Sequence, residues 1–486
     1  MDLRLLIVFA GAFAALWAIV NWRLAVQAVM VLLVVEGAIR KWLFPGAQDL
    51  VYLGKDVLLV GAYLGFMRQR AQLRLKLPAL PGFYVLLAFA AAFGLFQIAN
   101  PNLPNLLVGI FGFKAYFLYV PLLFVVPAAF DGDRDLALFL RRYILLSIPV
   151  GVLAVFQFLS PASSALNTYA RAAEGEGAGY ISTFGSSEFV RVTATFSYIS
   201  GYGSYLIAIT FLVLAYLAAC RWRLRLGKTA YVSLGLALLG MMMTGSRGPV
   251  LIVATLFPIY WWLAVMRGAE GAATFGRLLL GLGLLAVLIG STGGNAVKAF
   301  AGRASASSGE VMTRIVYPFT SPFEVMSSAG PVGFGIGATH QTAMALTEGI
   351  PAYSWLHGIA VESESAKIML ELGPIGFFLV YSQRLFLIFF ALSQVLRLRT
   401  TFHRALATAC LLFFLAALPG SIVFDITSDL FYWFFAGLLV LVVRLDRQVV
   451  RRALRPAAAL VPGGPEPRTA PVPAAAGAGM GARRAR

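Results

Sequence analysis

The sequence predicts an all-α protein, a polytopic bundle of roughly 12 or 13 transmembrane helices. Of its 486 residues, 60% are hydrophobic and only 12% are charged. A soluble surface needs roughly a quarter to a third charged residues, so lipid must be the main solvent of this chain. Apolar stretches of about 17–25 residues, the length that crosses a bilayer, recur from the first residues to about residue 445. They leave no room for a separate soluble catalytic domain.

The basic residues indicate how the chain is oriented in the membrane. The formal net charge of +18 would suggest nucleic-acid binding in a soluble protein, but here the Lys and Arg residues gather in short loops between apolar stretches. The positive-inside rule places such loops in the cytoplasm. The clusters are Arg68, Arg70, Arg74 and Lys76; Arg221, Arg223, Arg225 and Lys228; Arg397, Arg399 and Arg404; and Arg444, Arg447, Arg451, Arg452 and Arg455.

The predicted spans alternate from these basic loops, and each is an apolar run bounded by turn or charge signals. They are 83–99, 106–130, 143–160, 198–220, 229–246, 248–266, 278–294, 365–396, 405–423 and 430–445. Before them, the runs 4–21, 24–39 and 51–67 are either three spans or two spans and an interfacial helix, which leaves the N-terminus outside or inside. The first run lacks a small-residue cleavage site and is predicted to be a retained helix.

Two large loops are predicted to lie outside the cytoplasm, within a transmembrane domain that covers residues 1–455. The loop at about 161–197 carries only two basic residues, and in the partly helical loop at about 295–363 the basic residues are balanced by glutamates. The tail 456–486 is rich in Pro, Ala and Gly, so we expect it to be disordered and cytoplasmic.

Few ionisable residues interrupt the predicted spans, and each is therefore a candidate for function. Glu36 and Arg40 stand four residues apart and can pair on one helix face, while Lys55 and Asp56 interrupt the next span. These four residues either hold the bundle together by internal pairing or serve the activity. Lys114, in the run GIFGFKAYFLY, has no acid nearby in the sequence and needs an anion from elsewhere in the fold.

The sharpest local signal is MMMTGSRGPVLIV, residues 241–253, where Arg247 is the only charge in a stretch long enough for two helices and a tight turn. The loop assignment puts this turn outside. An arginine there runs against the positive-inside bias, which favours a functional role over simple snorkelling to lipid headgroups. With Arg191 and Arg314 it makes a set of arginines able to reach one external cavity, the arrangement that bidentate phosphate recognition favours.

The second external loop holds further polar signals. It contains Arg314 in EVMTRIVYPF, the glycine-rich run GFGIGATHQ, then His357 and the acidic stretch VESESAKIMLELGPIGFF. The glycine-rich run either contacts a phosphate or simply allows the chain to turn.

These motifs, in this order and at these places, resemble those of the O-antigen ligase and Wzy-type polymerase superfamily, which are membrane glycosyltransferases that build or attach bacterial surface polysaccharides. The resemblance covers most of the membrane region. It is carried by TGSRG at 244–248 at the end of a span, by Arg314 ahead of GFGIG, by ELGPIGFF at 371–378 at the start of a span, and by RVTATFSYISGYGSYL at 191–206.

The resemblance also implies a catalytic residue. In ligases of this family a histidine followed by asparagine lies about three helical turns before the Glu-Leu-Gly and is a proposed catalytic residue. Here the matching place is near Glu362, and His357 lies five residues earlier. The base is therefore Glu362 or Glu364, or His357 acting from the preceding turn. This departure from the ligase pattern slightly favours a polymerase.

The implied activity is that of an inverting, metal-independent glycosyltransferase in the bacterial inner membrane, with its site facing the periplasm or cell exterior. The implied donor is a glycan on undecaprenyl pyrophosphate and the acceptor is another glycan. Arg247 and Arg314, with Arg191 and Lys114, would hold the pyrophosphate while the base takes the acceptor proton. Membrane lipids are the expected surroundings, other polysaccharide-assembly proteins are compatible partners, and neither nucleic acid nor a cofactor is implied.

No metal site is predicted. Asp425 and Asp429, in DITSD, are the one acid pair in an external loop, and their spacing at the start of a span is typical of a helix cap. Cys220 and Cys410 both fall in apolar stretches, so neither a disulfide framework nor a cysteine metal site is indicated.

A transporter or flippase for an anionic lipid-linked saccharide is the alternative, because it would use the same cations to carry its substrate. Transporters often show internal repeats with broken helices near the membrane midplane. No such repeat is evident, and the signal residues lie at outer turns and loops, which favours chemistry at the membrane surface. A scaffold protein would not need isolated cations such as Lys114 and Arg247.

Overall fold

The computed structural model describes residues 3–73, 80–170, 182–184, 189–219, 226–265, 311–340, 343, 346–347 and 361–459. The chain divides into two units, Met1–Asp446 and Arg447–Arg486, and the site described below lies entirely in the first. Within the described ranges the regular elements are helices, and the only strand-type pairing is an isolated bridge between Thr183 and Val190. The predicted all-α class is confirmed.

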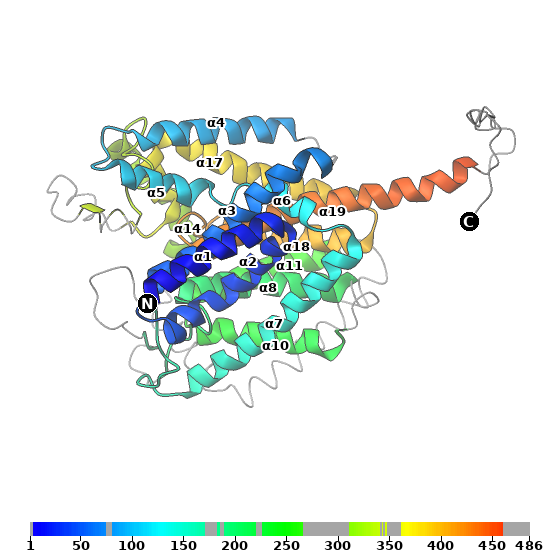
Figure 1. Cartoon of the computed structure of the whole chain (residues 1–486), viewed down its shortest axis with the longest axis horizontal. Coiled ribbons are helices and arrows are strands. Elements are labelled where there is room, and N and C mark those ends of the chain that lie inside the picture. Colours follow the sequence, from blue (N-terminus) through cyan, green and yellow to red (C-terminus); the bar gives the residue numbers. More distant parts are fainter. Residues whose placement is uncertain are drawn as a thin grey trace, which may run out of the picture. The chain divides into compact units, whose positions relative to one another are not determined.

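The helices follow the predicted spans closely (Figure 1). They are α1 Leu3–Val20, α2 Trp22–Ala38, the π-helix η1 Ile39–Leu43, α3 Gln48–Leu73, α4 Pro81–Ile98, α5 Leu106–Phe117, α6 Leu122–Ala129, α7 Asp133–Leu159, α8 Ile199–Ala219, α10 Lys228–Met243, α11 Arg247–Val265, α14 Val311–Ala329, α17 Glu364–Arg397, α18 Thr401–Ala417 and α19 Ile426–Ala459. The predicted span 278–294 lies outside the described residues.

By length and hydropathy, seven described helices can cross a membrane, and α5 with α6 make an eighth as a pair bent by 41°. This is fewer than the predicted 12 or 13. Four predicted spans correspond to shorter apolar helices, namely Ile7–Val20, Lys228–Met243, Arg247–Leu263 and Thr401–Ala417, and the predicted span 278–294 is outside the described part of the chain. The protein is therefore a multi-pass helical membrane protein.

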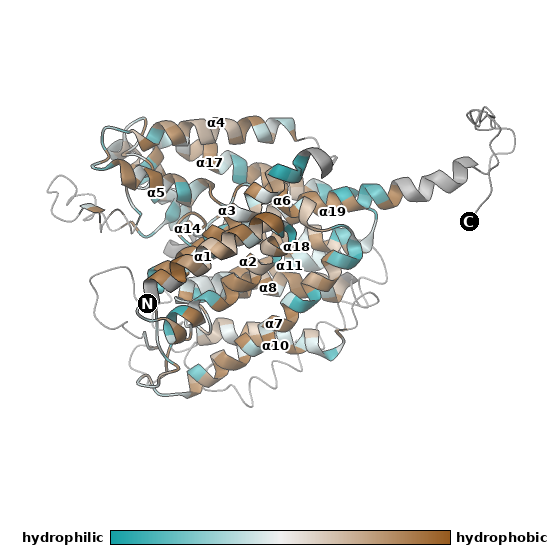
Figure 2. Cartoon of the chain, viewed as in Figure 1, coloured by the Kyte–Doolittle hydropathy of each residue, from teal (hydrophilic) through white to brown (hydrophobic). Residues whose placement is uncertain are grey.

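The centre of the bundle is formed by α8 and by the first part of α19. In each of them 89% of the apolar span is buried, against 22% for α4. Stacked aromatic rings fill the space between neighbouring helices. The ring centroids of Phe413 in α18 and Phe435 in α19, for example, are 4.5 Å apart. On the outside, Phe13 of α1 and Phe89 of α4 are 73% and 65% exposed. Apolar residues dominate the visible side of α1 (Figure 2), as expected for a surface that faces lipid.

The two ends of the bundle differ in their polar groups. At one end, His403 near the start of α18 lies 2.8 Å from Asp133 of α7 and 3.2 Å from Asp446 of α19. At the other end α2 finishes and α3, α8, α17 and α19 begin. Since α18 runs from His403 towards the segment 421–425, these two groups lie at opposite ends of the same helix.

α17 consists of two helical segments that meet at a break at Gly373, and a second glycine, Gly333, contacts this break. Gly373 has φ +61° and Gly333 has φ +76°, and the backbones of the two segments are in direct contact: a Cβ on Gly373 would lie 2.6 Å from the Pro331 carbonyl oxygen. Only glycine fits such a close approach at positive φ. The segment after α14 is thereby fixed along the first turns of α17, and the Phe334 amide donates to the Leu370 carbonyl oxygen at 2.8 Å.

We expect Gly373→Ala to lower the free energy of unfolding by about 2–4 kcal/mol, because a left-handed alanine is strained and its methyl group overlaps the Pro331 carbonyl. Thermal unfolding in detergent measures the change. Gly82→Ala is the control, since a Cβ on Gly82 meets no atom within 4 Å, and it should stay within about 1 kcal/mol of the parent protein. Equal unfolding temperatures for both variants would contradict the expected overlap.

Candidate functional site

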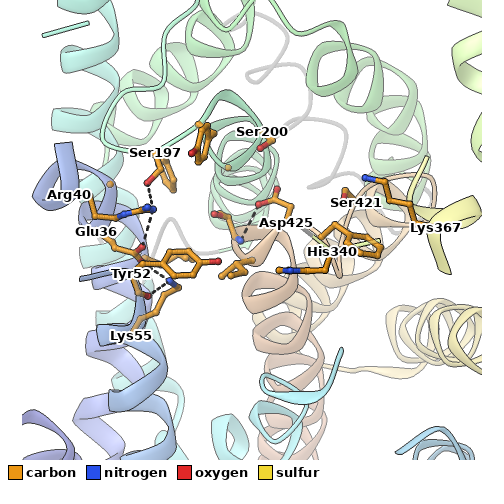
Figure 3. A pocket seen from close by; sticks show the side chains of 18 of the residues that line it. Glu36, Arg40, Tyr52, Lys55, Ser197, Ser200, His340, Lys367, Ser421 and Asp425 are labelled. Carbon is orange, nitrogen blue, oxygen red and sulfur yellow. Dashed lines mark hydrogen bonds and ion pairs between the residues drawn. The ribbon is translucent and has the colours of Figure 1, made fainter. Parts of the chain in front are cut away.

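A polar pocket of about 410 Å³ lies at the end of the bundle where α2 finishes and α3, α8, α17 and α19 begin. Its walls come from stretches of chain that are far apart in the sequence. The polar and charged residues that line it are Glu36, Arg40, Tyr52, Lys55, Ser197, Tyr198, Ser200, Thr339, His340, Lys367, Ser421, Asp425 and Thr427. Figure 3 shows Arg40 and Lys55 on one side of the pocket and His340 and Lys367 on the other.

The first wall holds two cations around one carboxylate. The Lys55 ammonium lies 2.7 Å from Glu36 and the Arg40 guanidinium 3.9 Å from it. Arg40 also donates to the Ser197 hydroxyl at 2.9 Å. The predicted Glu36–Arg40 pairing is confirmed, and Lys55 joins it from the next helix. One carboxylate against two cations leaves this wall with a net positive charge.

The ring of Tyr52 lies within this group of charges. Its centroid is 4.9 Å from Arg40 and 4.0 Å from Lys55. Cation–π attraction of this kind holds like charges near one another without an acid for each. The Nε of Arg40 is buried and has no hydrogen-bond partner among the described residues, so this guanidinium has donor capacity left.

Lys114 lies behind the same wall and does not line the pocket. Its ammonium is 2.6 Å from Asp56, whose other oxygen accepts from the Tyr119 hydroxyl at 2.7 Å. The expectation that Lys114 needs an anion from a distant part of the chain is therefore confirmed. The ammonium also lies 5.8 Å from the Tyr52 ring centroid.

The second wall is formed by Lys367 of α17 and by His340. The Lys367 ammonium lies 5.3 Å from the centroid of the Phe424 ring, and no described carboxylate pairs with it. Burial, together with the positive charges of Lys114 and Lys367, lowers the pKa of His340 to about 4. The imidazole is therefore neutral near pH 7 and retains a basic nitrogen.

Glu371, the acid of the ELGPIGFF motif, positions the neighbour of His340. Its carboxylate accepts from both the backbone amide and the hydroxyl of Thr339 at 2.8 Å, and from the Tyr116 hydroxyl at 2.8 Å. Because Glu371 is fully buried, this acid fixes the segment that carries His340 instead of facing the pocket.

Asp425 forms the floor between the two walls. It accepts from the hydroxyls of Ser204 and Ser428 at 2.8 and 2.9 Å and from the Thr427 amide at 3.2 Å. The last contact is the predicted cap of α19. Burial raises the pKa of Asp425 despite these donors. Asp429 is buried one turn further on, and the described residues contain no cluster of three or more His, Cys, Asp or Glu that could hold a metal ion.

Of the predicted bases, Glu364 is buried and fully engaged. One oxygen lies 2.5 Å from Arg384, and the other accepts from the Ile422 and Phe424 amides at 2.6 and 3.2 Å. These contacts hold the segment before α19 against the start of α17. Glu362 is exposed and does not line the pocket, and His357 lies outside the described residues.

Of the predicted phosphate-binding arginines, Arg191 lies on the TGSRG turn. Its Nε donates to the Thr244 carbonyl oxygen at 2.9 Å, and Arg247 is half-buried at the start of α11. The structure thus brings these two segments together, although neither arginine lines the pocket. The backbone of Arg314 belongs to α14, and its side chain is outside the described part of the chain.

The segment that follows Arg191 connects this turn to the pocket. Lys41 of η1 is 4% exposed, and its ammonium donates to the Thr193 hydroxyl and to the carbonyl oxygens of Ala194 and Phe196 at 2.7–3.1 Å. Phe196 itself lines the pocket, as does Ser200 four residues further on.

Sequence reasoning missed His340 and Lys367 as site residues. Both occur in stretches that drew attention, GFGIGATHQ and VESESAKIM, but nothing local to either residue indicates that the two side chains meet across one cavity. The sequence feature that could have linked His340 to Lys367 is that both stretches belong to a region assigned to the same side of the membrane.

No family model, curated protein or solved structure matches this chain. Fold and site together define a multi-pass helical membrane protein with a cation-rich pocket at one end of its bundle.

Proposed function

We propose that this protein is a membrane glycosyltransferase of the bacterial inner membrane that polymerises or ligates undecaprenyl-pyrophosphate-linked oligosaccharides in the synthesis of a surface polysaccharide, with polymerisation favoured. The observation that carries the proposal is the charge of the pocket. Three cations, Arg40, Lys55 and Lys367, line it with two acids, Glu36 and Asp425, and burial raises the pKa of Asp425. Such a cavity suits a phosphate-bearing ligand.

The orientation of the bundle supports an external site. The basic clusters follow the far ends of the helices that start at the pocket, and the positive-inside rule assigns that far side to the cytoplasm. The pocket then opens outside, where no nucleotide sugar is available. A lipid-linked pyrophosphate is an activated donor that can be present there.

The residues of the pocket suggest a division of labour. The acceptor hydroxyl attacks the anomeric carbon, the bond from that carbon to the phosphate oxygen breaks, and the pyrophosphate leaves with the electron pair. Arg40 and Lys367 stabilise the charge that develops on the leaving group. We propose that the predicted arginines, Arg191, Arg247 and Arg314, add to the positive charge available on this side of the membrane.

The base must take up the proton of the hydroxyl group on the acceptor glycan. Neutral His340 lines the pocket and suits this role, with Glu362 and His357 as the other candidates. We assign Glu364 a positioning role instead, because both of its oxygens already hold the pocket wall.

The position of the pocket disfavours the transporter alternative. It lies where several helices begin or end, whereas transporters bind their substrates near the membrane midplane. A site at one end of the bundle serves a reaction at one membrane surface.

Cells that lack the protein test the proposal. Surface polysaccharide and undecaprenyl-linked intermediates are resolved by chain length. Accumulated single repeat units without long chains are expected for a polymerase, and long chains stranded on lipid would indicate a ligase. Wild-type glycans of every length would refute both activities.

A pH profile tests the base. We expect His340→Gln to lower the rate about 10²–10⁴-fold. In the parent protein the rate should also fall as the pH drops through about 4, because His340 gains a proton there and loses its basic nitrogen. The residual rate of the variant should lack this acid limb. Initial rates on lipid-linked donor in liposomes measure both, and an identical acid limb in both proteins would exclude His340.

A further inference from the structure

The helix α14 has three distinct faces. It lies in the loop that the sequence places outside, and it is not among the helices long and apolar enough to cross a membrane. One face packs on the start of α17: the Ser321 and Ser363 hydroxyls are hydrogen-bonded, and Ser365 donates to the Pro318 carbonyl oxygen. This face anchors the helix to the bundle.

A second face is apolar and exposed. Val316, Phe319, Phe323 and Met326 are 41–55% exposed. Their spacing of three, four and three residues places them in one stripe along a helix with 3.6 residues per turn. Exposing a row of large apolar side chains to water is energetically unfavourable, so this stripe needs an apolar environment.

The third face is polar and exposed. Thr320, Glu324, Ser327 and Ser328 lie on it, and helical spacing puts them along one edge of the apolar stripe, between the stripe and the buried face. The exposed surface of α14 is therefore split lengthwise into an apolar half and a polar half. A helix lying along a bilayer surface has this division.

The apolar stripe continues a surface that already faces lipid. Phe323 packs against Phe377 of α17, with ring centroids 6.4 Å apart. Beside Phe377, Ile375 and Phe378 are 50% and 57% exposed within the candidate span Glu364–Arg397. The stripe of α14 and the lipid-facing flank of α17 thus form one continuous apolar band.

We propose that α14 is an interfacial helix, with its apolar stripe among the acyl chains of the outer leaflet and its polar face in water. The occupant of the stripe is bilayer lipid, because the stripe adjoins the lipid-facing flank of α17 and its other edge borders polar residues. This placement holds whether or not the protein is a glycosyltransferase. It also sets the depth of the pocket, since Lys367 lies one turn beyond the Ser363 that α14 contacts, so the pocket opens at the level of lipid headgroups.

Nitroxide labels on the full-length protein in liposomes test this placement. Cys220→Ser and Cys410→Ala remove the native thiols, and single cysteines then replace Phe319 or Phe323 on the stripe. Thr320→Cys and Glu324→Cys are matched controls one residue away on the polar face. Collision rates with oxygen, which concentrates in lipid, and with a water-soluble nickel chelate are measured at each site.

We expect oxygen to dominate at 319 and 323 and the nickel chelate to dominate at 320 and 324, with an accessibility ratio that differs at least about tenfold between the two faces. High nickel accessibility at all four sites would place α14 in water and overturn the proposal. Low accessibility to both reagents at 319 and 323 would also overturn it, because protein, such as a second copy of this chain, would then cover the stripe. Val316→Cys repeats the measurement where an aromatic replacement fails to fold.

Discussion

Lys367→Met is expected to reduce glycan synthesis about 10²–10³-fold at normal protein level. The Lys367 ammonium has no carboxylate partner among the described residues and faces the pocket, so its removal takes away charge that the leaving pyrophosphate needs. The loss should appear mainly in kcat, because the phosphate charge grows in the transition state. Chain-length analysis of lipid-linked glycan in complemented cells, together with rates in liposomes, measures the effect.

Lys228→Met is the matched control for this variant. Lys228 is also a lysine in the first turns of a helix, but it is exposed at the start of α10, at the opposite end of that helix from the TGSRG turn. Its replacement should leave synthesis within about twofold. Full synthesis by Lys367→Met would mean that the pocket does not hold the donor phosphate.

Arg384→Met is expected to lower the free energy of unfolding by about 3–5 kcal/mol, because it leaves the Glu364 carboxylate buried without its cation. The two groups are 2.5 Å apart, and both side chains are almost fully buried. Chemical unfolding in detergent micelles measures the change. The same variant should loosen the segment 421–425 and weaken synthesis, since Glu364 holds that segment through backbone amides.

Two further variants separate this charge effect from the loss of packing. Arg397→Met removes an exposed arginine from the last turn of the same helix and should change stability by about 0.5 kcal/mol or less. The double variant Glu364→Gln with Arg384→Met should be more stable than Arg384→Met alone, because no uncompensated charge remains. A single variant as stable as the parent would show that the ion pair contributes nothing.

The sequence was a good guide to where the helices lie. Apolar runs and turn residues act locally, and the predicted runs 83–99 and 198–220 became α4 and α8 almost residue for residue, whereas the predicted run 365–396 is broken at Gly373. It was a poorer guide to how many helices span the membrane at full length, because the apolar helices Ile7–Val20 and Lys228–Met243 are shorter than a bilayer requires. Whether a short apolar helix crosses alone depends on its neighbours, which no local pattern records.

The ion pairs of the site show the same difference between local contacts, which the sequence predicts, and contacts between helices, which it does not. The Glu36–Arg40 pair follows from one turn of helix and was predictable. The contacts Lys55–Glu36 and Lys114–Asp56 join different helices and depend on how those helices pack. Sequence could state only that an isolated buried cation needs an anion, and for Lys114 that requirement was correct. Nothing in the sequence requires His340 and Lys367 to lie in the same pocket, and this placement was not predicted.

The Tyr52 ring reduces the repulsion between the cationic groups on one side of this pocket. Three cationic groups, from Arg40, Lys55 and Lys114, lie within 4.0–5.8 Å of its centroid, and the negative face of an aromatic ring offsets part of their mutual repulsion. The ring therefore helps to hold the Arg40 guanidinium in place beside the Lys55–Glu36 and Lys114–Asp56 ion pairs. The groups that would bind an anion are therefore already in position, so its binding requires little reorganisation of the pocket.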